Sequence, residues 1–327
     1  MGDKAKTDPS TTPAISEAAA GSLQKFVAAI AHHKIVFLGK MVGRLLYAVD
    51  VRHRRIVRRN LKFAFPQWEW KRVLKVTRQV FENFGITLLE ILQISCFSRE
   101  DMQFKVRIDA EEKIQHLLSE KGMILISGHL GNWELALLFA SSHLGDRIFA
   151  IARKIDFAPL DRWIYHFRTR FGGEVVNKRG ALGDMTRAVR SGKVLATLID
   201  QGTMPHEGID ATFFGRKVMA TPGIAMLAMR ARVPVMPAFC VRGKSGYKVI
   251  LEEPLAMQRS GNLRTDIQTN TQSIMDAIEK AVRKYPEQYF WFHKRWKIYY
   301  PHLYSEDLEK HRRREEKQQR KQSTEPR

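Results

Sequence analysis

Apolar residues along this chain occur in two patterns, short unbroken runs and longer stretches at helical spacing. The unbroken runs have the length of buried strands and lie at 123–127, 147–152 and 194–199. Helix-length segments separate these runs, at 133–144, 158–171 and 181–191. Strands that alternate with helices are typical of a mostly parallel sheet. We therefore predict an α/β fold in which helices cover a mostly parallel central sheet.

The same reading extends the fold on both sides of these runs. Further helices are predicted at 71–94, 222–232 and 265–284. The apolar runs at 233–241 and 247–251 are separated by Arg-Gly-Lys-Ser-Gly, which predicts a β-hairpin.

The amino-terminal residues do not share this alternation. Residues 1–20 are rich in Ala, Ser, Thr, Asp and Pro and are predicted to be a disordered leader. An amphipathic helix is then predicted over 23–49, with apolar positions at Phe26, Ile30, Phe37, Met41, Leu45 and Val49. Such a helix could lie in a membrane interface or dock on the rest of the chain. Six Arg or Lys residues without an acid follow between 52 and 62, and this favours the membrane, because each contributes about 1 kcal/mol near an anionic surface.

The charge balance points to acidic partners. The chain of 327 residues has 55 Lys and Arg against 34 Asp and Glu, a net charge of +21. Anionic lipid headgroups, nucleic acid and acidic proteins all fit that charge, although scattered charges are mostly solvated surface. Only Cys96 and Cys240 occur, in apolar surroundings, which excludes a disulfide scaffold and suits a reducing cytosolic location. We find neither a signal-peptide pattern nor an unbroken apolar run long enough to span a bilayer.

The candidate chemistry lies directly after the run at 123–127. His129 and Glu134 stand five positions apart, at the predicted carboxyl end of a strand, where open α/β sheets bind their ligands. A neutral imidazole can accept a proton from a hydroxyl near pH 7, and a neighbouring carboxylate would fix its tautomer. A structural histidine is the common alternative, because this spacing also arises by chance.

The residues around His129 resemble a known family signature. Residues 128–134 read Gly-His-Leu-Gly-Asn-Trp-Glu, which is similar to the first block of the lipid A late acyltransferases (lauroyl and myristoyl transferases). These enzymes form a branch of the bacterial lysophospholipid acyltransferase superfamily. Four similar blocks follow in the family's order: the second at 150–153, the third at 200–202 with 213–215 and 220–223, the fourth at 233–237 and the last at 286–297. Each block alone is weak, but five in this order are specific.

The chain departs from the family pattern at two places. The family often has Asn-Pro shortly after the arginine of its second block, whereas residues 156–159 here read Asp-Phe-Ala-Pro, which leaves the substrate contacts of that loop open. The family usually has a hydrophobic amino-terminal membrane segment. Here that segment is interrupted by Lys25, His32, His33, Lys34, Lys40 and Arg44.

The resemblance implies a glycerolipid acyltransferase-like fold and transfer of a fatty acyl chain from a thioester to a hydroxyl of a lipid A precursor. His129 would be the general base with Glu134, and backbone amides near Gly131 or at the start of the following helix would stabilise the oxyanion. An ornithine lipid or a glycerophospholipid remains open as acceptor. The donor would be acyl carrier protein, an acidic partner for a basic chain, or acyl-CoA. No cofactor is expected beyond this co-substrate.

The other blocks supply candidate substrate-binding residues. Arg153 could hold a phosphate in a bidentate fork, and Asp200 could bind a substrate hydroxyl or pair with Arg153. Asn132 belongs to the signature, and Phe214, Gly215 and Arg216 combine aromatic bulk, a close turn and a cation, which fits the neck of an amphiphile. The alternatives are a surface ion pair for Arg153, which the order of the blocks disfavours, and core packing for the aromatic pair, which is the commoner role of adjacent aromatics.

Four regions follow from this reading. We expect a leader at 1–20, a basic membrane-associating segment at 21–62, an acyltransferase domain at 63–304 and a basic disordered tail at 305–327. The protein would be peripheral or monotopic, on the cytoplasmic face of the cell inner membrane, with anionic lipids as partners.

Other classes of function have weaker support. No metal-ligand spacing, Walker A loop or Gly-x-Ser-x-Gly elbow is found, and no specific nucleic-acid partner is expected. A non-enzymatic binder of membranes or nucleic acid could use the basic clusters alone. A thioesterase could use the same histidine with water as the nucleophile.

Overall fold

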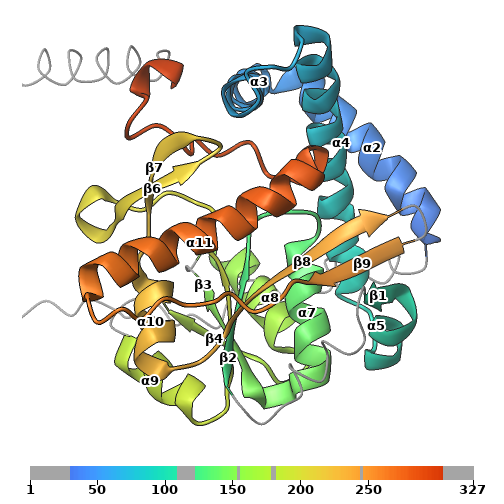
Figure 1. Cartoon of the computed structure of the whole chain (residues 1–327). Helices are drawn as coiled ribbons and strands as arrows, with labels where there is room; N and C mark the ends of the chain where they lie inside the picture. Colours follow the sequence, from blue (N-terminus) through green and yellow to red (C-terminus); the bar gives the residue numbers. More distant parts are fainter. Residues whose placement is uncertain (1–29, 109–121, 153–154, 178–181, 244–245, 305–327) are drawn as a thin grey trace, which may run out of the picture.

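The computed structural model describes residues 30–108, 122–152, 155–177, 182–243 and 246–304 (Figure 1). The expected leader at 1–20, the expected tail at 305–327 and Arg153 lie outside the described residues.

A seven-stranded sheet forms the centre of the molecule, in the order β1-β9-β8-β2-β5-β3-β4. Its strands are β1 (Val106–Ile108), β2 (Met123–Ser127), β3 (Ile148–Ala152), β4 (Glu174–Asn177), β5 (Val194–Leu198), β8 (Val235–Gly243) and β9 (Gly246–Leu251). Neighbouring strands are parallel except β8 and β9, which pair as an antiparallel hairpin. The predicted α/β fold, its mostly parallel sheet and its hairpin are confirmed. The sequence reading missed β1 and β4, which have only three and four residues and therefore give little periodic signal.

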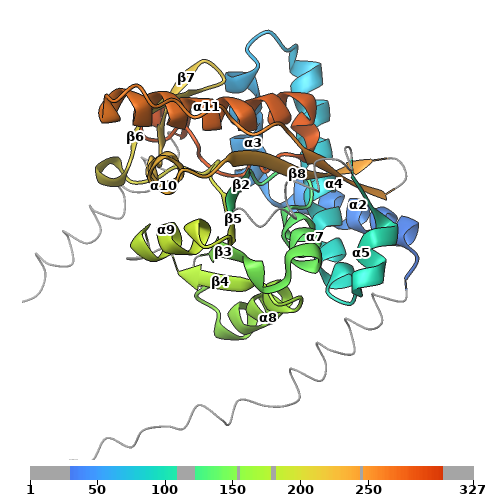
Figure 2. The same cartoon turned by 60° about the horizontal axis from the view of Figure 1, so that its bottom comes forward.

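Helices cover both faces of this sheet. One face packs against α3 (Val51–Ala64), α4 (Trp70–Ile94), α9 (Leu182–Arg190), α10 (Gly223–Ala231) and α11 (Leu263–Lys284). The other packs against α5 (Arg99–Lys105), α7 (Trp133–Leu144) and α8 (Ala158–Thr169). Figure 2 shows α11 and α8 on opposite sides of the sheet. Short 3-10 turns occupy η2 (Gly145–Arg147), η3 (Pro205–Glu207), η4 (Pro286–Gln288) and η5 (Pro301–Tyr304).

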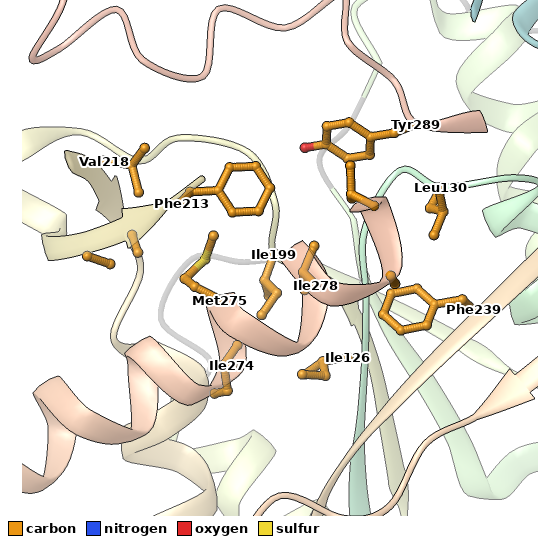
Figure 3. Close-up of a cluster of buried hydrophobic side chains, with 14 of the residues drawn as sticks. Ile126, Leu130, Ile199, Phe213, Val218, Phe239, Ile274, Met275, Ile278 and Tyr289 are labelled. Atoms are coloured by element: carbon orange, nitrogen blue, oxygen red, sulfur yellow. The ribbon is translucent and has the colours of Figure 1, made fainter. Parts of the chain in front are cut away.

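The alternation of side chains along β2 divides the core into two clusters. Ile126 points into the larger cluster with Ile278 of α11 and Phe239 of β8 (Figure 3). Leu125 points to the opposite face, into the cluster that α7 completes. Because β2 is buried on both faces, its sequence is an unbroken apolar run, as parallel strands require.

The basic segment at the amino terminus is made of two helices. α2 (His32–Val49) ends at Asp50, whose carboxylate accepts a hydrogen bond from His53 N at 3.0 Å and begins α3. Val57 and Leu61 of α3 are fully buried in the larger core cluster. The domain boundary expected at residue 62 therefore falls inside a helix of the main core.

Glycines set the packing of α2 on α4. A Cβ at Gly39 would lie 2.4 Å from Ile86 Cα, and one at Gly85 would lie 2.3 Å from Gly39 O. Gly43 is equally tight, at 2.3 Å from Phe81 O. The backbones of the two helices thus approach more closely than any larger residue would allow.

A small second sheet lies beside α11. It is an antiparallel ribbon of β6 (Ile209–Phe213) and β7 (Arg216–Ala220), which the sequence reading did not predict. The tight turn between them places Phe214 at φ 56° and Gly215 at φ 67°. Gln272 of α11 bonds both the amide and the carbonyl of Thr212 and so fixes the ribbon to the main domain.

Candidate active site

His129 and Asp200 meet at the carboxyl edge of the sheet. In the parallel pairing of β2 with β5, Ser127 lies opposite Leu198. His129 and Asp200 each follow two residues later, so the register brings them side by side. Asp200 Oδ1 lies 2.8 Å from His129 Nδ1, and Asp200 Oδ2 accepts a hydrogen bond from His129 N at 3.0 Å. The carboxylate therefore fixes both the ring and the backbone of the histidine.

This contact sets the protonation state of the pair. Burial opposes a charged imidazolium, but the charge and hydrogen bond of Asp200, with the charge of Glu134, outweigh it and raise the pKa of His129. Burial likewise opposes a charged Asp200, yet the charge of His129, its two hydrogen bonds and the Tyr289 hydroxyl lower the pKa of this carboxyl. With a proton on Nδ1 shared with an ionised Asp200, Nε2 is left as the basic nitrogen. The side-chain amide of Gln201 lies 3.4 Å from that atom.

Glu134 has a different partner from the one we expected. It lies in the first turn of α7, and its carboxylate receives two hydrogen bonds from Arg168 of α8, at 2.9 and 2.5 Å. We expected Glu134 to orient the imidazole, but in the structure Asp200 makes that contact. Glu134 acts on His129 through its charge, since its effect on the pKa is electrostatic.

The loop amides after His129 are already used. Gly131 N donates to Gln288 O at 3.0 Å, and Asn132 N donates to Cys240 O at 2.8 Å. Leu130 N donates to Gly128 O at 2.7 Å. The expected oxyanion site near Gly131 is thus contradicted for these amides, because their protons point into the protein.

Asn132 is also turned away from the substrate. Its side chain is fully buried, with Oδ1 accepting from Leu135 N at 3.0 Å and Nδ2 donating to Glu90 Oε2 at 3.1 Å. The side chain caps α7, which is the role that asparagine commonly has at a helix start. The substrate contact expected of Asn132 is replaced by this internal one.

The turn at 214–216 lies in the β6–β7 ribbon and does not line the cavity described below. Phe214 is buried and packs against Phe65 and Trp291. The Arg216 guanidinium lies over the ring of Phe63. These contacts are core packing and a surface cation–π pair, so the structure does not bring this expected group to His129.

A cavity of about 840 Å³ opens beside the imidazole. β3 pairs with β5 only from Ile148 to Ala150, and beyond that point the two strands separate while β5 continues beside β2. The cavity lies at this separation and reaches both faces of the sheet. Its lining is mostly apolar and includes several small side chains, among them Ala136, Ala140, Ala150, Ala152, Ala196 and Ala238.

Several polar groups line the cavity together with the imidazole. His129, Glu134, Arg168, Gln201 and Thr203 all line it. A large apolar cavity with a few convergent polar groups is typical of a small-molecule or lipid site. Among the described residues, no group of three or more His, Cys, Asp and Glu is arranged to hold a metal ion.

The sequence reading therefore found the histidine and misassigned its neighbours. Asp200 was expected to bind a substrate hydroxyl or to pair with Arg153. The signal that could have revealed its role was its place directly after a predicted parallel strand. Arg168 and Tyr289 gave no comparable signal, since one lies in an amphipathic helix and the other in an aromatic stretch.

Comparison with known proteins identifies the family of this chain. The family model described as bacterial lipid A biosynthesis acyltransferase matches residues 18–298. The lipid A biosynthesis lauroyltransferase of Escherichia coli K12 is 26% identical over 267 residues, which cover 80% of this chain and 84% of that protein. A lipid A biosynthesis acyltransferase of Haemophilus influenzae is 24% identical, covering 71% and 72%. The lipid A biosynthesis palmitoleoyltransferase of Escherichia coli K12 is 23% identical, covering 80% and 85%.

A solved structure, the 1-acyl-sn-glycerophosphate acyltransferase PlsC of Thermotoga maritima, shares 14% identity with a TM-score of 0.35, over 78% of this chain and 98% of that one. The family model spans most of the chain and includes His129 and Asp200. The chain is therefore an O-acyltransferase and belongs to the bacterial lipid A biosynthesis acyltransferase family.

Proposed function

We propose that this protein transfers a fatty acyl chain from an acyl thioester to a hydroxyl of a lipid A precursor, with His129 as the general base and Asp200 as its partner. The observation that supports this most strongly is the His129–Asp200 pair, at 2.8 Å, beside a mostly apolar cavity. A base oriented by a buried carboxylate is the arrangement that activates a hydroxyl for acyl transfer.

The reaction proceeds by direct attack. The acceptor hydroxyl gives its proton to His129 Nε2 as its oxygen bonds to the thioester carbonyl carbon. The tetrahedral intermediate then collapses, the carbon–sulfur bond breaks, and the thiolate takes the proton from the imidazolium. Cys240, the one cysteine buried near this edge, points into the core, and burial raises the pKa of its thiol, so it is no nucleophile.

The apolar cavity is the place for the acyl chain. Its alanine-rich lining provides apolar surface and leaves space that larger side chains would fill. In this arrangement the thioester carbonyl lies close to His129, and the hydrocarbon extends between β3 and β5.

The donor and the acceptor follow from charge and chemistry. The excess of 21 positive charges favours acyl carrier protein, which is acidic, and acyl-CoA phosphates would meet the same charge. The proposed acceptor is a lipid A precursor. An ornithine lipid and a glycerophospholipid are the alternative acceptors.

The test is an assay with purified protein, the fatty acyl thioester of acyl carrier protein and each acceptor lipid in turn. We expect thiol release that depends on the acceptor, with an acylated lipid A precursor seen by mass spectrometry. His129→Ala should lower turnover by about 10²–10⁴-fold, because general base catalysis is lost. Near-normal turnover in this variant would reject the role of His129. Acceptor-independent thiol release would indicate a thioesterase, and polyanion binding without thiol release would indicate a non-enzymatic binder.

Membrane association is proposed from α2. Its residues Phe37, Met41, Leu45 and Val49 recur every four positions and are 48–65% exposed, while the glycine face of the same helix packs on α4. No described helix combines the length and apolarity needed to cross a bilayer. An exposed apolar stripe beside the basic α3 fits a peripheral or monotopic protein on an anionic surface, here the cytoplasmic face of the cell inner membrane.

A matched pair of leucines tests this surface. Leu45 of α2 and Leu263 of α11 are both 63% exposed. We expect Leu45→Gln to weaken binding to anionic vesicles about threefold or more and Leu263→Gln to leave it unchanged. Equal binding of both variants would contradict docking through α2.

A further inference from the structure

A buried ion pair outside the cavity holds the loop that contains His129. We propose that Glu90 of α4, together with Arg242 of β8, positions His129 for the reaction through a hydrogen bond to Asn132. This inference rests on the proposed function, because it concerns the geometry of the proposed base.

The ion pair is complete and nearly inaccessible. The Glu90 side chain is fully buried and that of Arg242 is 8% exposed. Arg242 Nε and Nη2 lie 2.7 and 2.6 Å from the two carboxylate oxygens, which is a bidentate fork. Asn83 Oδ1 and Thr87 Oγ1 of α4 accept two further guanidinium protons, at 2.6 and 3.2 Å.

One further bond leads from this pair to the catalytic loop. Glu90 Oε2 accepts from Asn132 Nδ2 at 3.1 Å, three residues after His129. Asn132 in turn caps α7, the helix whose first turn contains Glu134. The pair thus fixes the point where the loop ends and the helix begins.

The loop itself is inserted between two distant segments. Gly131 bridges to Cys240 of β8, and Leu130 bridges to Tyr289 on the other side. Phe290 N donates to His129 O at 2.9 Å. Gly131 has φ +64°, and a Cβ there would lie 2.0 Å from Cys240 O, so only glycine fits this close approach.

Gln288 joins the same two segments to Arg242. Its side chain accepts from Arg242 N at 2.8 Å and donates to Arg242 O at 3.0 Å, while its own carbonyl accepts from Gly131 N. Arg242 therefore contacts the loop's surroundings from two sides, through Glu90 and through Gln288.

This arrangement is better explained by positioning than by stability. A buried ion pair is often no more stabilising than apolar side chains of the same volume. A proton transfer, by contrast, depends on placing the base within a fraction of an ångström, and a misplacement of 1 Å can cost about 10²-fold in rate. One of the hydrogen bonds that Glu90 accepts comes from Asn132, in the loop that requires such placement.

Two variants test the hydrogen bond between Asn132 and Glu90 separately from the stability of the fold. Asn132→Ser keeps a good helix cap and the Glu90–Arg242 pair, but its side chain is too short to reach Glu90. Glu90→Gln keeps the shape but replaces one acceptor oxygen with an NH2 group, so it cannot accept all three hydrogen bonds that Arg242 and Asn132 donate to Glu90. The matched control is Asp266→Asn, because Asp266 is a buried carboxylate on α11 that accepts from Ser260 and lies outside the loop.

Three measurements decide the matter, namely kcat and KM for the thioester, the melting temperature, and the proton NMR signal of His129 Nδ1–H. We expect Asn132→Ser and Glu90→Gln to lower kcat about tenfold or more with KM within about twofold, and to shift or broaden the Nδ1–H signal. The double variant should be no worse than the poorer single one, because both break the same link. Asp266→Asn should lower the melting temperature while kcat and the signal stay unchanged.

A folded Asn132→Ser protein with wild-type kcat and an unchanged signal would overturn the proposal. So would losses of kcat that follow the melting temperature across all variants, the control included. If Glu90→Gln does not fold, Asn132→Ser decides alone. Retained activity in His129→Ala would reject the proposed function, whereas the Nδ1–H signal would still report whether the link positions the ring.

Discussion

Two carboxylates lie near His129, and they differ in how the chain delivers them. Asp200 follows β5 at the edge of the sheet and bonds the imidazole directly, whereas Glu134 lies in the first turn of α7 and bonds Arg168. Glu134 is five residues from the histidine and Asp200 is 71 residues away. Strand register, rather than proximity in sequence, therefore selected the acid that orients the base.

The largest effect should come from Asp200. We expect Asp200→Asn to lower kcat by about 10²–10⁴-fold, because an amide at this position can donate to Nδ1 and place the ring proton on Nε2, the wrong tautomer for a base. Steady-state kinetics on the folded variant measures this. If Asp200→Asn lowered kcat less than Glu134→Gln does, Glu134 rather than Asp200 would be the more important acid for His129.

An intermediate effect is expected from Glu134. Glu134→Gln removes the charge that faces both Arg168 and His129, and we expect kcat to fall about tenfold and stability by about 3 kcal/mol, since a largely buried Arg168 loses its counterion. Thermal unfolding and kinetics measure the two losses. The second substitution Arg168→Gln should recover stability. If it also recovers kcat, Glu134 matters through the ion pair rather than through the imidazole.

The smallest effect is a shift in pH dependence. The pKa of His129 is raised, so the base is protonated and inactive up to a higher pH than an ordinary imidazole, and activity should rise as pH increases through that value. Glu134 raises this pKa and Arg168 lowers it. We therefore expect the acidic limb of the kcat/KM profile to move to lower pH in Glu134→Gln and to higher pH in Arg168→Gln, each by about one unit or less. Shifts of the same sign in both variants would contradict a charge effect on His129.

Much of the fold could be read from the sequence because the patterns are local. The run at 123–127 and the helix at 133–144 agree with β2 and α7 residue for residue. β6 and β7 were missed, because these two short strands mix buried with exposed polar residues and so have no long continuous apolar run. The amino-terminal helix was predicted over 23–49. α2 ends at Val49 as predicted, but it begins at His32, since residues 30–31 are not helical, and 23–29 lie outside the described residues.

The site could be predicted only in part. His129 was identified from its place after a buried strand. Asp200 was recognised as its partner only from the register of β2 and β5 in the structure. Asn132 belongs to the signature for a reason that sequence alone does not show, since its partner Glu90 lies on α4.

The sequence by itself determined the alternation of the longer strands and helices, the excess of positive charge and the position of the imidazole at the end of a strand. These depend on spacing and composition, which need no knowledge of distant partners. Only the tertiary structure decided which acid holds the imidazole, where Glu134 points and where a cavity opens between β3 and β5. Those outcomes depend on pairing between segments far apart in the chain, and such pairing is set by packing of the whole domain rather than by any one stretch of it.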